Sequence, residues 1–99
     1  MEEEAKRNYT IELYDIYGSL LTEKQRNYFE DYYFSDLSIS EMAENYDISR
    51  NGVFDQIKRA VGALEDYENH LHLHEKFKKI DSLEMDSKLK EEILNLLKE

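Results

Sequence analysis

The chain has 99 residues, with 13 Lys and Arg against 23 Asp and Glu, a formal net charge of −10, three glycines, and neither cysteine nor proline. This length accommodates one domain, and the missing cysteine excludes disulfide frameworks and thiolate chemistry and indicates a reducing compartment. The acidic balance argues against strong non-specific binding to DNA or anionic membranes, and without a secretory signal or an apolar run of roughly 20 residues we expect a cytoplasmic protein.

Helix is favoured throughout, because leucine, isoleucine, glutamate and lysine dominate and proline is absent. The first predicted helix covers roughly residues 9–19. Gly18 is expected to close it, since glycine readily takes the left-handed conformation that ends a helix. Its apolar stripe, at helical spacing, consists of Leu13, Ile16, Tyr17 and Leu20.

The second predicted helix starts at Thr22. Thr22 and Gln25 fit a capping box, in which each side chain satisfies a free backbone N–H group of the first turn. The buried side of this helix is marked by Phe29, Tyr32 and Tyr33.

The third predicted helix is short and covers residues 39–46. Ser38 and Glu41 fit a second capping box at its start. Asp47 follows at the turn, where aspartate tolerates backbone angles that most residues avoid. The inward-facing residues are Met42, Ala43 and Tyr46.

The fourth helix begins with Ser49 as its N-cap and is predicted to run to about Ile80. Its apolar residues follow an a/d heptad pattern: Val53, Ile57, Ala60, Leu64, Tyr67 and Leu71. A fifth, amphipathic helix is expected between residues 85 and 98, after a hinge at residues 81–83. The apolar stripe of the fifth helix consists of Leu89, Ile93, Leu96 and Leu97.

These elements predict an all-α fold, a small helical bundle with a helix-turn-helix at residues 37–64. Residues 1–80 form the helix-turn-helix domain with its long helix, and residues 81–99 belong to the same domain or are an appendage. A helix-turn-helix needs a small residue where its helices cross, an apolar residue at the turn and an apolar pair in the second helix. These are Ala43, Ile48, and Val53 with Ile57.

Residues 21–65 resemble the fourth conserved region of bacterial sigma factors. The pattern consists of a leucine-led cap, an aromatic helix, LSISEMA, then S-R-x-x-V and R-A-x-x-x-L. The chain is closer still to the YlxM-like family, through ISRNGVFDQIKR and LEDYENHLHL within residues 21–73. That family consists of helix-turn-helix proteins of Gram-positive bacteria and mycoplasmas, encoded beside the signal recognition particle GTPases. The resemblance implies a regulatory role and, by gene neighbourhood, a link to signal recognition particle proteins.

The second helix of the motif is expected to face DNA with its outward side chains. Arginine pairs with guanine and asparagine with adenine, and an aromatic edge touches a thymine methyl group. The expected DNA-contacting residues on this helix are Ser49, Arg50, Asn51, Phe54, Asp55, Lys58 and Arg59. Lys24 and Arg26 are further candidates for contacts with the phosphate backbone.

The charge of the motif weakens this DNA hypothesis. Residues 49–60 hold three basic side chains and one acidic side chain, whereas tight binding often uses about 6–10 phosphate contacts. A homodimer would double the number of cations, and the seam of Leu64, Tyr67 and Leu71 is the candidate dimer or partner surface. The alternative is a helix-turn-helix that binds proteins, including signal recognition particle components. An enzyme is not expected, because the chain lacks a phosphate-binding loop and a convergent acid–base group.

The remaining features favour no cofactor and no metal. His70 and His74 share a face if the fourth helix continues, but no further ligand completes a metal site, so a solvated or interface face is expected. Core packing rather than stacking on bases is expected for Tyr14, Tyr17, Phe29, Tyr32, Tyr33 and Tyr46. Phe54 is the exception, because it projects away from Val53 and Ile57.

Overall fold

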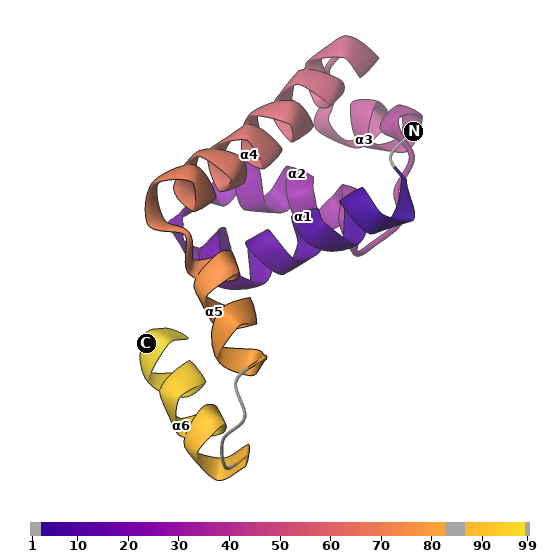
Figure 1. Cartoon of the computed structure of the whole chain (residues 1–99). Helices are drawn as coiled ribbons and strands as arrows, with labels where there is room; N and C mark the ends of the chain where they lie inside the picture. Colours follow the sequence, from indigo (N-terminus) through magenta and orange to yellow (C-terminus); the bar gives the residue numbers. More distant parts are fainter. Residues whose placement is uncertain (1–2, 83–86, 99) are drawn as a thin grey trace.

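The helices of this chain form a four-helix body from which a two-helix arm projects (Figure 1). The computed structural model describes residues 3–82 and 87–98, which contain no strand. The body consists of α1 (Glu4–Tyr17), α2 (Glu23–Tyr33), α3 (Ile39–Tyr46) and α4 (Arg50–Leu71), with a short 3-10 turn, η1 (Gly18–Leu20), after α1. The arm consists of α5 (Leu73–Asp81) and α6 (Ser87–Lys98). The predicted all-α fold is confirmed.

The predicted starts of α2 and α3 are confirmed. In α2 the Thr22 side chain accepts from the backbone N–H of Gln25, whose side chain accepts from the backbone N–H of Thr22. Ser38 and Glu41 form the same reciprocal pair at α3. These short-range bonds satisfy donors that a helix start leaves free, so the residues that make them can be found from spacing alone.

Three expectations for α1 were wrong. The helix starts at Glu4 rather than near residue 9, because Arg7 donates to the backbone oxygen of Tyr33 at 3.0 Å and ties the first turns to α2. Leu20 is 53% exposed. Gly18 has φ −55, so it is not left-handed; a Cβ there would lie 3.0 Å from the Tyr14 ring, and this close approach is what requires glycine.

The core lies where α1, α2 and α3 pack against α4. Phe29 is at its centre, fully buried, with its ring stacked on Tyr14 and on Tyr33. Tyr28, which sequence spacing had not singled out, is also buried and stacks on Tyr46. The fully or nearly fully buried core comprises Leu13, Tyr17, Leu21, Tyr28, Phe29, Tyr33, Met42, Val53, Ile57, Ala60 and Leu64.

The long fourth helix does not reach Ile80. It ends at Leu71, because His72 takes a left-handed conformation with φ 56. The cause is Glu68, a buried carboxylate whose Oε1 accepts from the Tyr17 hydroxyl at 2.7 Å and from the backbone N–H of His74 at 3.0 Å. Its Oε2 accepts from the N–H of Glu75 at 3.3 Å. Glu68 therefore caps the start of α5 and holds the arm at an angle to α4.

A second contact fixes α5 to α1. His74 is buried, its Nε2 lies 2.6 Å from Oε2 of Glu12, and its ring meets the Tyr9 ring edge-on at 4.9 Å. The Tyr17 hydroxyl also accepts from the backbone N–H of Leu73 at 3.1 Å. The first turn of α5 is thus anchored to the body by polar groups of α1 and α4.

The pKa of Glu68 links this junction to pH. Burial alone raises that pKa, but the hydrogen bonds from Tyr17, His74 and Glu75, helped by the nearby His74 imidazole, outweigh burial and hold the pKa below its ordinary value of 4.5. A lowered pKa in the folded state stabilises the fold above the unfolded-state value, and this contribution is lost as pH falls through the folded value.

We expect the stability difference between the wild type and Glu68→Ala to be full above about pH 5 and to shrink towards pH 3. Urea denaturation of both proteins across this range measures it; a difference that stays constant would contradict the assignment.

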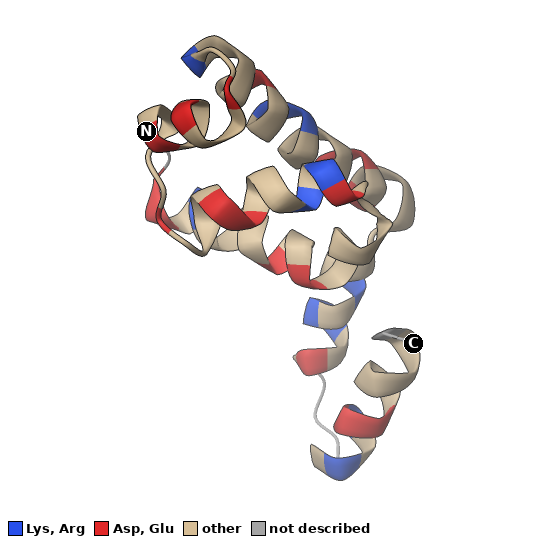
Figure 2. Cartoon of the chain, turned by 180° about the vertical axis from the view of Figure 1, so that it is seen from behind, with Lys and Arg blue, Asp and Glu red and all other residues tan. Residues whose placement is uncertain are grey.

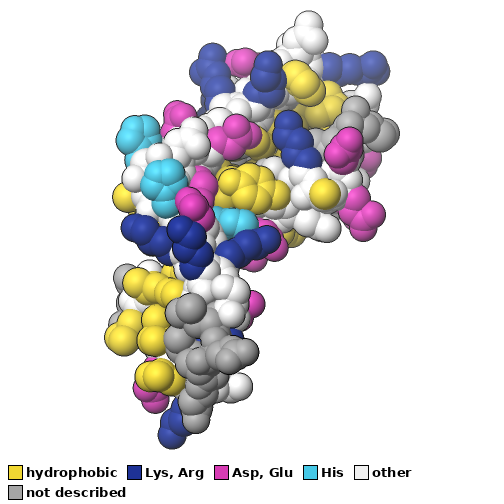
Figure 3. Space-filling view, viewed as in Figure 1, with side chains coloured by type: hydrophobic (Ala, Val, Ile, Leu, Met, Phe, Trp, Pro, Cys, Tyr) yellow, Lys and Arg dark blue, Asp and Glu magenta, His cyan; other side chains and the backbone are white. Residues whose placement is uncertain are grey.

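The arm stands away from the body in both Figure 1 and the view from behind in Figure 2. α6 lies against α5, and Lys90 donates to the backbone oxygen of Asp81 at 2.6 Å. The predicted C-terminal helix is confirmed, whereas its expected start at Met85 and the hinge residue Leu83 lie outside the described residues. Hydrophobic side chains gather on the surface of this arm (Figure 3). Among the described residues, none of the helices combines the length and apolar character needed to cross a lipid bilayer.

Candidate nucleic-acid interface

The helix-turn-helix consists of α3, a tight turn and the first half of α4. Asp47 is left-handed with φ 55, as predicted, and the backbone N–H of Ile48 donates to the oxygen of Ala43 at 3.1 Å. Ser49 then caps α4, since its hydroxyl oxygen accepts from the N–H of Gly52 at 3.0 Å. The turn is therefore closed by backbone and hydroxyl hydrogen bonds within residues 43–52.

The predicted apolar anchors of the motif are only partly correct. Val53 and Ile57 are buried and join α4 to the core, as expected. Ile48 is exposed, so it is not a buried anchor for the corner. Met42 of α3, which was also expected to face inward, is fully buried. Ala43 is half-buried against the core, which fits its predicted place where the two helices cross.

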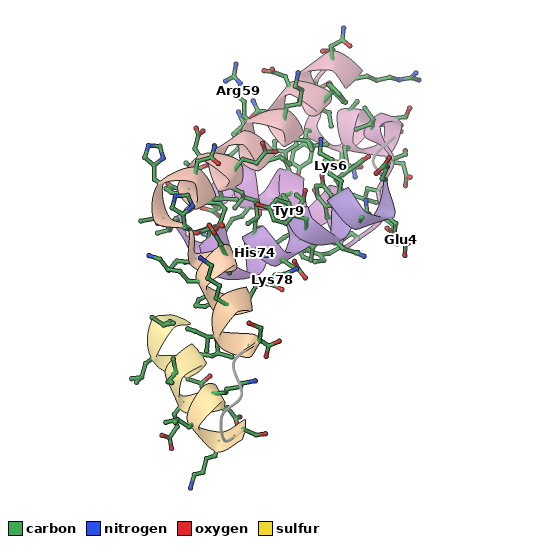
Figure 4. All side chains as sticks on the ribbon, viewed as in Figure 1. Glu4, Lys6, Tyr9, Arg59, His74 and Lys78 are labelled. Carbon is green, nitrogen blue, oxygen red and sulfur yellow. The ribbon has the colours of Figure 1, made fainter. Side chains whose placement is uncertain are left out.

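The first half of α4 presents polar side chains on the side opposite its buried residues. Arg50, Asn51, Asp55, Lys58 and Arg59 are exposed. Arg59 Nε lies 3.0 Å from Asp55 Oδ2, one helical turn away. Figure 4 shows Arg59 projecting from α4 away from the body.

Phe54 lies on this outer side too and is 56% exposed, which confirms that it is not a core residue. The ammonium group of Lys58 lies 5.8 Å from the centre of the Phe54 ring. The outer side of α4 therefore combines exposed polar and charged groups with the exposed aromatic ring of Phe54.

The two candidate phosphate contacts on α2 lie apart. Lys24 borders a depression with Tyr28 and Tyr46, beside the end of α3. Arg26 borders a different depression, on the side of α1, among the carboxylates of Asp15 and Glu30. Glu23 borders both depressions, but Lys24 lies beside the end of α3, whereas Arg26 lies beside α1 among two further carboxylates, so the structure does not bring the two cations together.

The three residues of the predicted seam at the end of α4 do not form one continuous exposed surface. Leu64 is fully buried in the core and cannot be part of a partner surface. The Tyr67 ring is half-buried and stacks on Tyr17 at 5.8 Å, and its hydroxyl lies 3.4 Å from the oxygen of Leu20. Leu71 alone of the three is exposed.

The histidines do not share a helix face, because α4 ends between them. His70 Nδ1 lies 2.7 Å from the backbone oxygen of Asp66, and His72 Nδ1 lies 3.4 Å from Oε2 of Glu75. His74 faces Glu12 in the interior. Within residues 3–82 and 87–98, His, Asp and Glu side chains form no group of three that could hold a metal ion.

The tyrosines predicted to be structural pack in or against the core. Burial, together with a hydrogen bond to Glu30, raises the pKa of Tyr14 to about 12. Burial and a hydrogen bond to Asp31 raise the pKa of Tyr46 to about 12. These hydroxyls remain protonated donors at neutral pH and tie α1 and α3 to α2.

Comparison with known proteins gives a family match over almost the whole chain. The model of the family described as "UPF0122: Putative helix-turn-helix protein, YlxM / p13 like" matches residues 4–99. This description names no enzymatic reaction.

Curated relatives carry the same family name. A UPF0122 protein of Shouchella clausii is 55% identical over 71 residues, which are 72% of this chain and 65% of that protein. One of Staphylococcus haemolyticus is 55% identical over 65 residues, 66% of this chain and 59% of that protein. One of Bacillus velezensis is 47% identical over 91 residues, 92% of this chain and 78% of that protein. The chain thus spans about two thirds of the length of the first two relatives.

Proposed function

Because this chain belongs to the UPF0122 family of YlxM/p13-like helix-turn-helix proteins, we propose that it is a regulatory protein that binds duplex DNA through α4. The observation that carries the proposal is the exposed polar row on the first half of α4, opposite the buried Val53 and Ile57. In a helix-turn-helix this half of the second helix enters the major groove.

Each side chain of the row has a base or phosphate that it suits. Arg50 fits the two acceptors of guanine and Asn51 fits adenine, while the Phe54 ring offers an apolar contact to a thymine methyl group. Lys58 fits a phosphate. The Ser49 oxygen already accepts from Gly52, but its hydroxyl hydrogen remains available for a phosphate oxygen.

Asp55 and Arg59 would act together. An aspartate on the groove side of the helix repels phosphate, but it suits the N4 amino group of cytosine. Arg59 neutralises Asp55 in the free protein through their 3.0 Å contact. Released on binding, Arg59 would reach a phosphate while Asp55 accepts from a base.

One copy supplies few cations, so the proposal includes a homodimer. Two copies of α4 spaced by about one DNA turn, roughly 34 Å, would read two half-sites and double the number of phosphate contacts. The affinity of such a dimer would depend steeply on salt.

A second candidate is a helix-turn-helix that binds a protein. The exposed ring of Phe54 and the net charge of −10 favour it. By the family resemblance, components of the signal recognition particle would be the partners to examine.

Fluorescence anisotropy with random and genomic duplex DNA at low salt tests the DNA proposal. We expect Arg50→Ala to lower the affinity for a preferred site by about 1–3 kcal/mol, and Lys58→Ala to reduce the salt slope by about 1 for all sequences. Lys78→Ala on α5 removes the same charge far from the first half of α4 and is the matched control. If the wild type binds no duplex even at low salt, the DNA proposal fails and the protein-binding candidate takes its place.

A further inference from the structure

A groove of about 650 Å³ runs along α4 on the side of Phe54. Glu3 and Lys6, at the start of α1, form its opposite wall, and the end of α2 and the start of α3 close it. Figure 4 shows Lys6 projecting from α1 on the side that faces α4. The lining is mainly apolar and comprises Tyr32, Tyr33, Ile39, Phe54, Ile57 and Val61. Such a groove has the form that receives the apolar side of a helix.

No contact among the described residues explains why position 62, in the α4 wall of this groove, is a glycine. A Cβ built there would meet no atom within 4 Å, and its φ is not positive. Glycine in the interior of a helix is less stable than alanine by about 1 kcal/mol. What Gly62 provides is bare backbone, which lets another element approach α4 closely.

α6 carries leucine side chains that are exposed in the part of the chain that the structure describes. Leu89 is 48% exposed, Leu96 is 69% exposed and Leu97 is 40% exposed. Leu89 and Leu96 are two turns apart and so lie on one side of the helix. An exposed leucine row on a short amphipathic helix is typical of a segment that docks into a groove.

The arm points away from the groove of its own chain. The groove borders residues 54–65 of α4, whereas the arm leaves the body beyond Leu71, at the other end of that helix. In Figure 1 α5 leads away from the body, and α6 runs back beside α5. None of the described residues of α6 borders the groove of its own chain.

We propose that α6 of each copy lies in the α1–α4 groove of a second copy, which forms a symmetric dimer. In such an arrangement the same two surfaces meet twice, as a closed two-fold dimer requires. The leucines of α6 would face the apolar lining, and α6 would cross the bare backbone at Gly62.

The charges beside the two surfaces match when α6 runs antiparallel to α4. The α4 wall carries Lys58 and then Glu65, about 10 Å apart along the helix. One flank of α6 carries Lys88 and then Glu92, about 6 Å apart and both exposed. Antiparallel docking places Lys88 near Glu65 and Glu92 near Lys58, and the length of these side chains spans the difference in spacing. Parallel docking would bring like charges together.

Sedimentation of the full chain at micromolar concentration tests the proposal without DNA. Its outcome is independent of DNA binding by α4, which the anisotropy measurement tests, although a monomeric chain would also contradict the homodimer included in the proposed function. We expect the wild type to sediment as two chains, and Leu96→Glu and Gly62→Leu each to sediment as one. Leu20→Glu is the matched control, because Leu20 is also an exposed leucine, at 53% exposure, but lies outside both surfaces. It should remain a dimer.

A mixing experiment separates a blocked groove from a damaged fold. Gly62→Leu replaces glycine by a better helix former and should not lower the melting temperature. Gly62→Leu keeps its α6 intact and Leu96→Glu keeps its groove intact, so their mixture should recover a heterodimer held by one docked helix. A monomeric wild type, a Gly62→Leu variant that still dimerises, or a mixture that stays monomeric would overturn the proposal.

Discussion

Replacing Phe29 with alanine is expected to lower the free energy of unfolding by about 3–5 kcal/mol. The Phe29 ring is fully buried and lies 4.4 Å from the Tyr14 ring, nearly parallel to it, and 4.3 Å from the Tyr33 ring. Its loss removes apolar burial and leaves a cavity between α1 and α2, which rings on both sides cannot easily fill. Urea denaturation followed by circular dichroism measures the change.

Phe34→Ala is the matched control for Phe29→Ala. The Phe34 ring lies in the same aromatic cluster, with its centre 5.5 Å from the Tyr14 ring and 6.0 Å from the Phe29 ring, but it is 49% exposed. Because the Phe34 ring buries much less surface than the Phe29 ring, its removal should lower the free energy of unfolding by about 1 kcal/mol or less. If the two variants lose the same free energy of unfolding, Phe29 is not the centre of the core that joins α2 to α4.

The helix starts could be predicted because their causes are local. Ser38, Ser49 and Thr22 bond to backbone N–H groups three residues away, so spacing alone reveals them. Asp47 was predicted at the turn for the same reason. The open position of Phe54 followed from the helical period, since the buried Val53 and Ile57 fix the inward side of α4.

The break after α4 could not be predicted from local pattern. The heptad continues to Leu71, and a glutamate such as Glu68 in a helix normally faces water. Its burial depends on Tyr17, which is 51 positions away in the sequence. The groove was missed for a related reason, because four helices line it and no single segment shows it.

Two residues belong to both proposed surfaces. Phe54 and Lys58 lie on the DNA-facing side of α4 and also border the groove. A docked α6 would cover them while leaving Asn51, Asp55 and Arg59 open. DNA and α6 would then compete for part of α4, so dimerisation through the groove would weaken DNA contacts at these two positions.

Glu68→Ala is expected to lower the free energy of unfolding by about 2–4 kcal/mol. The substitution leaves the Tyr17 hydroxyl and the N–H groups of His74 and Glu75 without the acceptor that they share, in a buried place. Glu65→Ala, one turn earlier on the same helix and exposed, should change stability by about 0.5 kcal/mol or less. Glu68→Gln keeps an acceptor oxygen and should fall between the two.

The same substitution should change the position of the arm. Without the cap, only the contacts of Leu73 and His74 with α1 remain to offset the left-handed backbone of His72, which for a residue other than glycine costs roughly 1–2 kcal/mol. The heptad that predicted a helix to Ile80 would then be free to form it, with α4 and α5 in one line. Hydrogen exchange of the His74 and Glu75 amides should become faster by the factor that corresponds to the lost free energy of unfolding. Small-angle scattering should show a longer molecule. If those amides keep their protection and the length is unchanged, the His74–Glu12 contact, rather than Glu68, holds the arm.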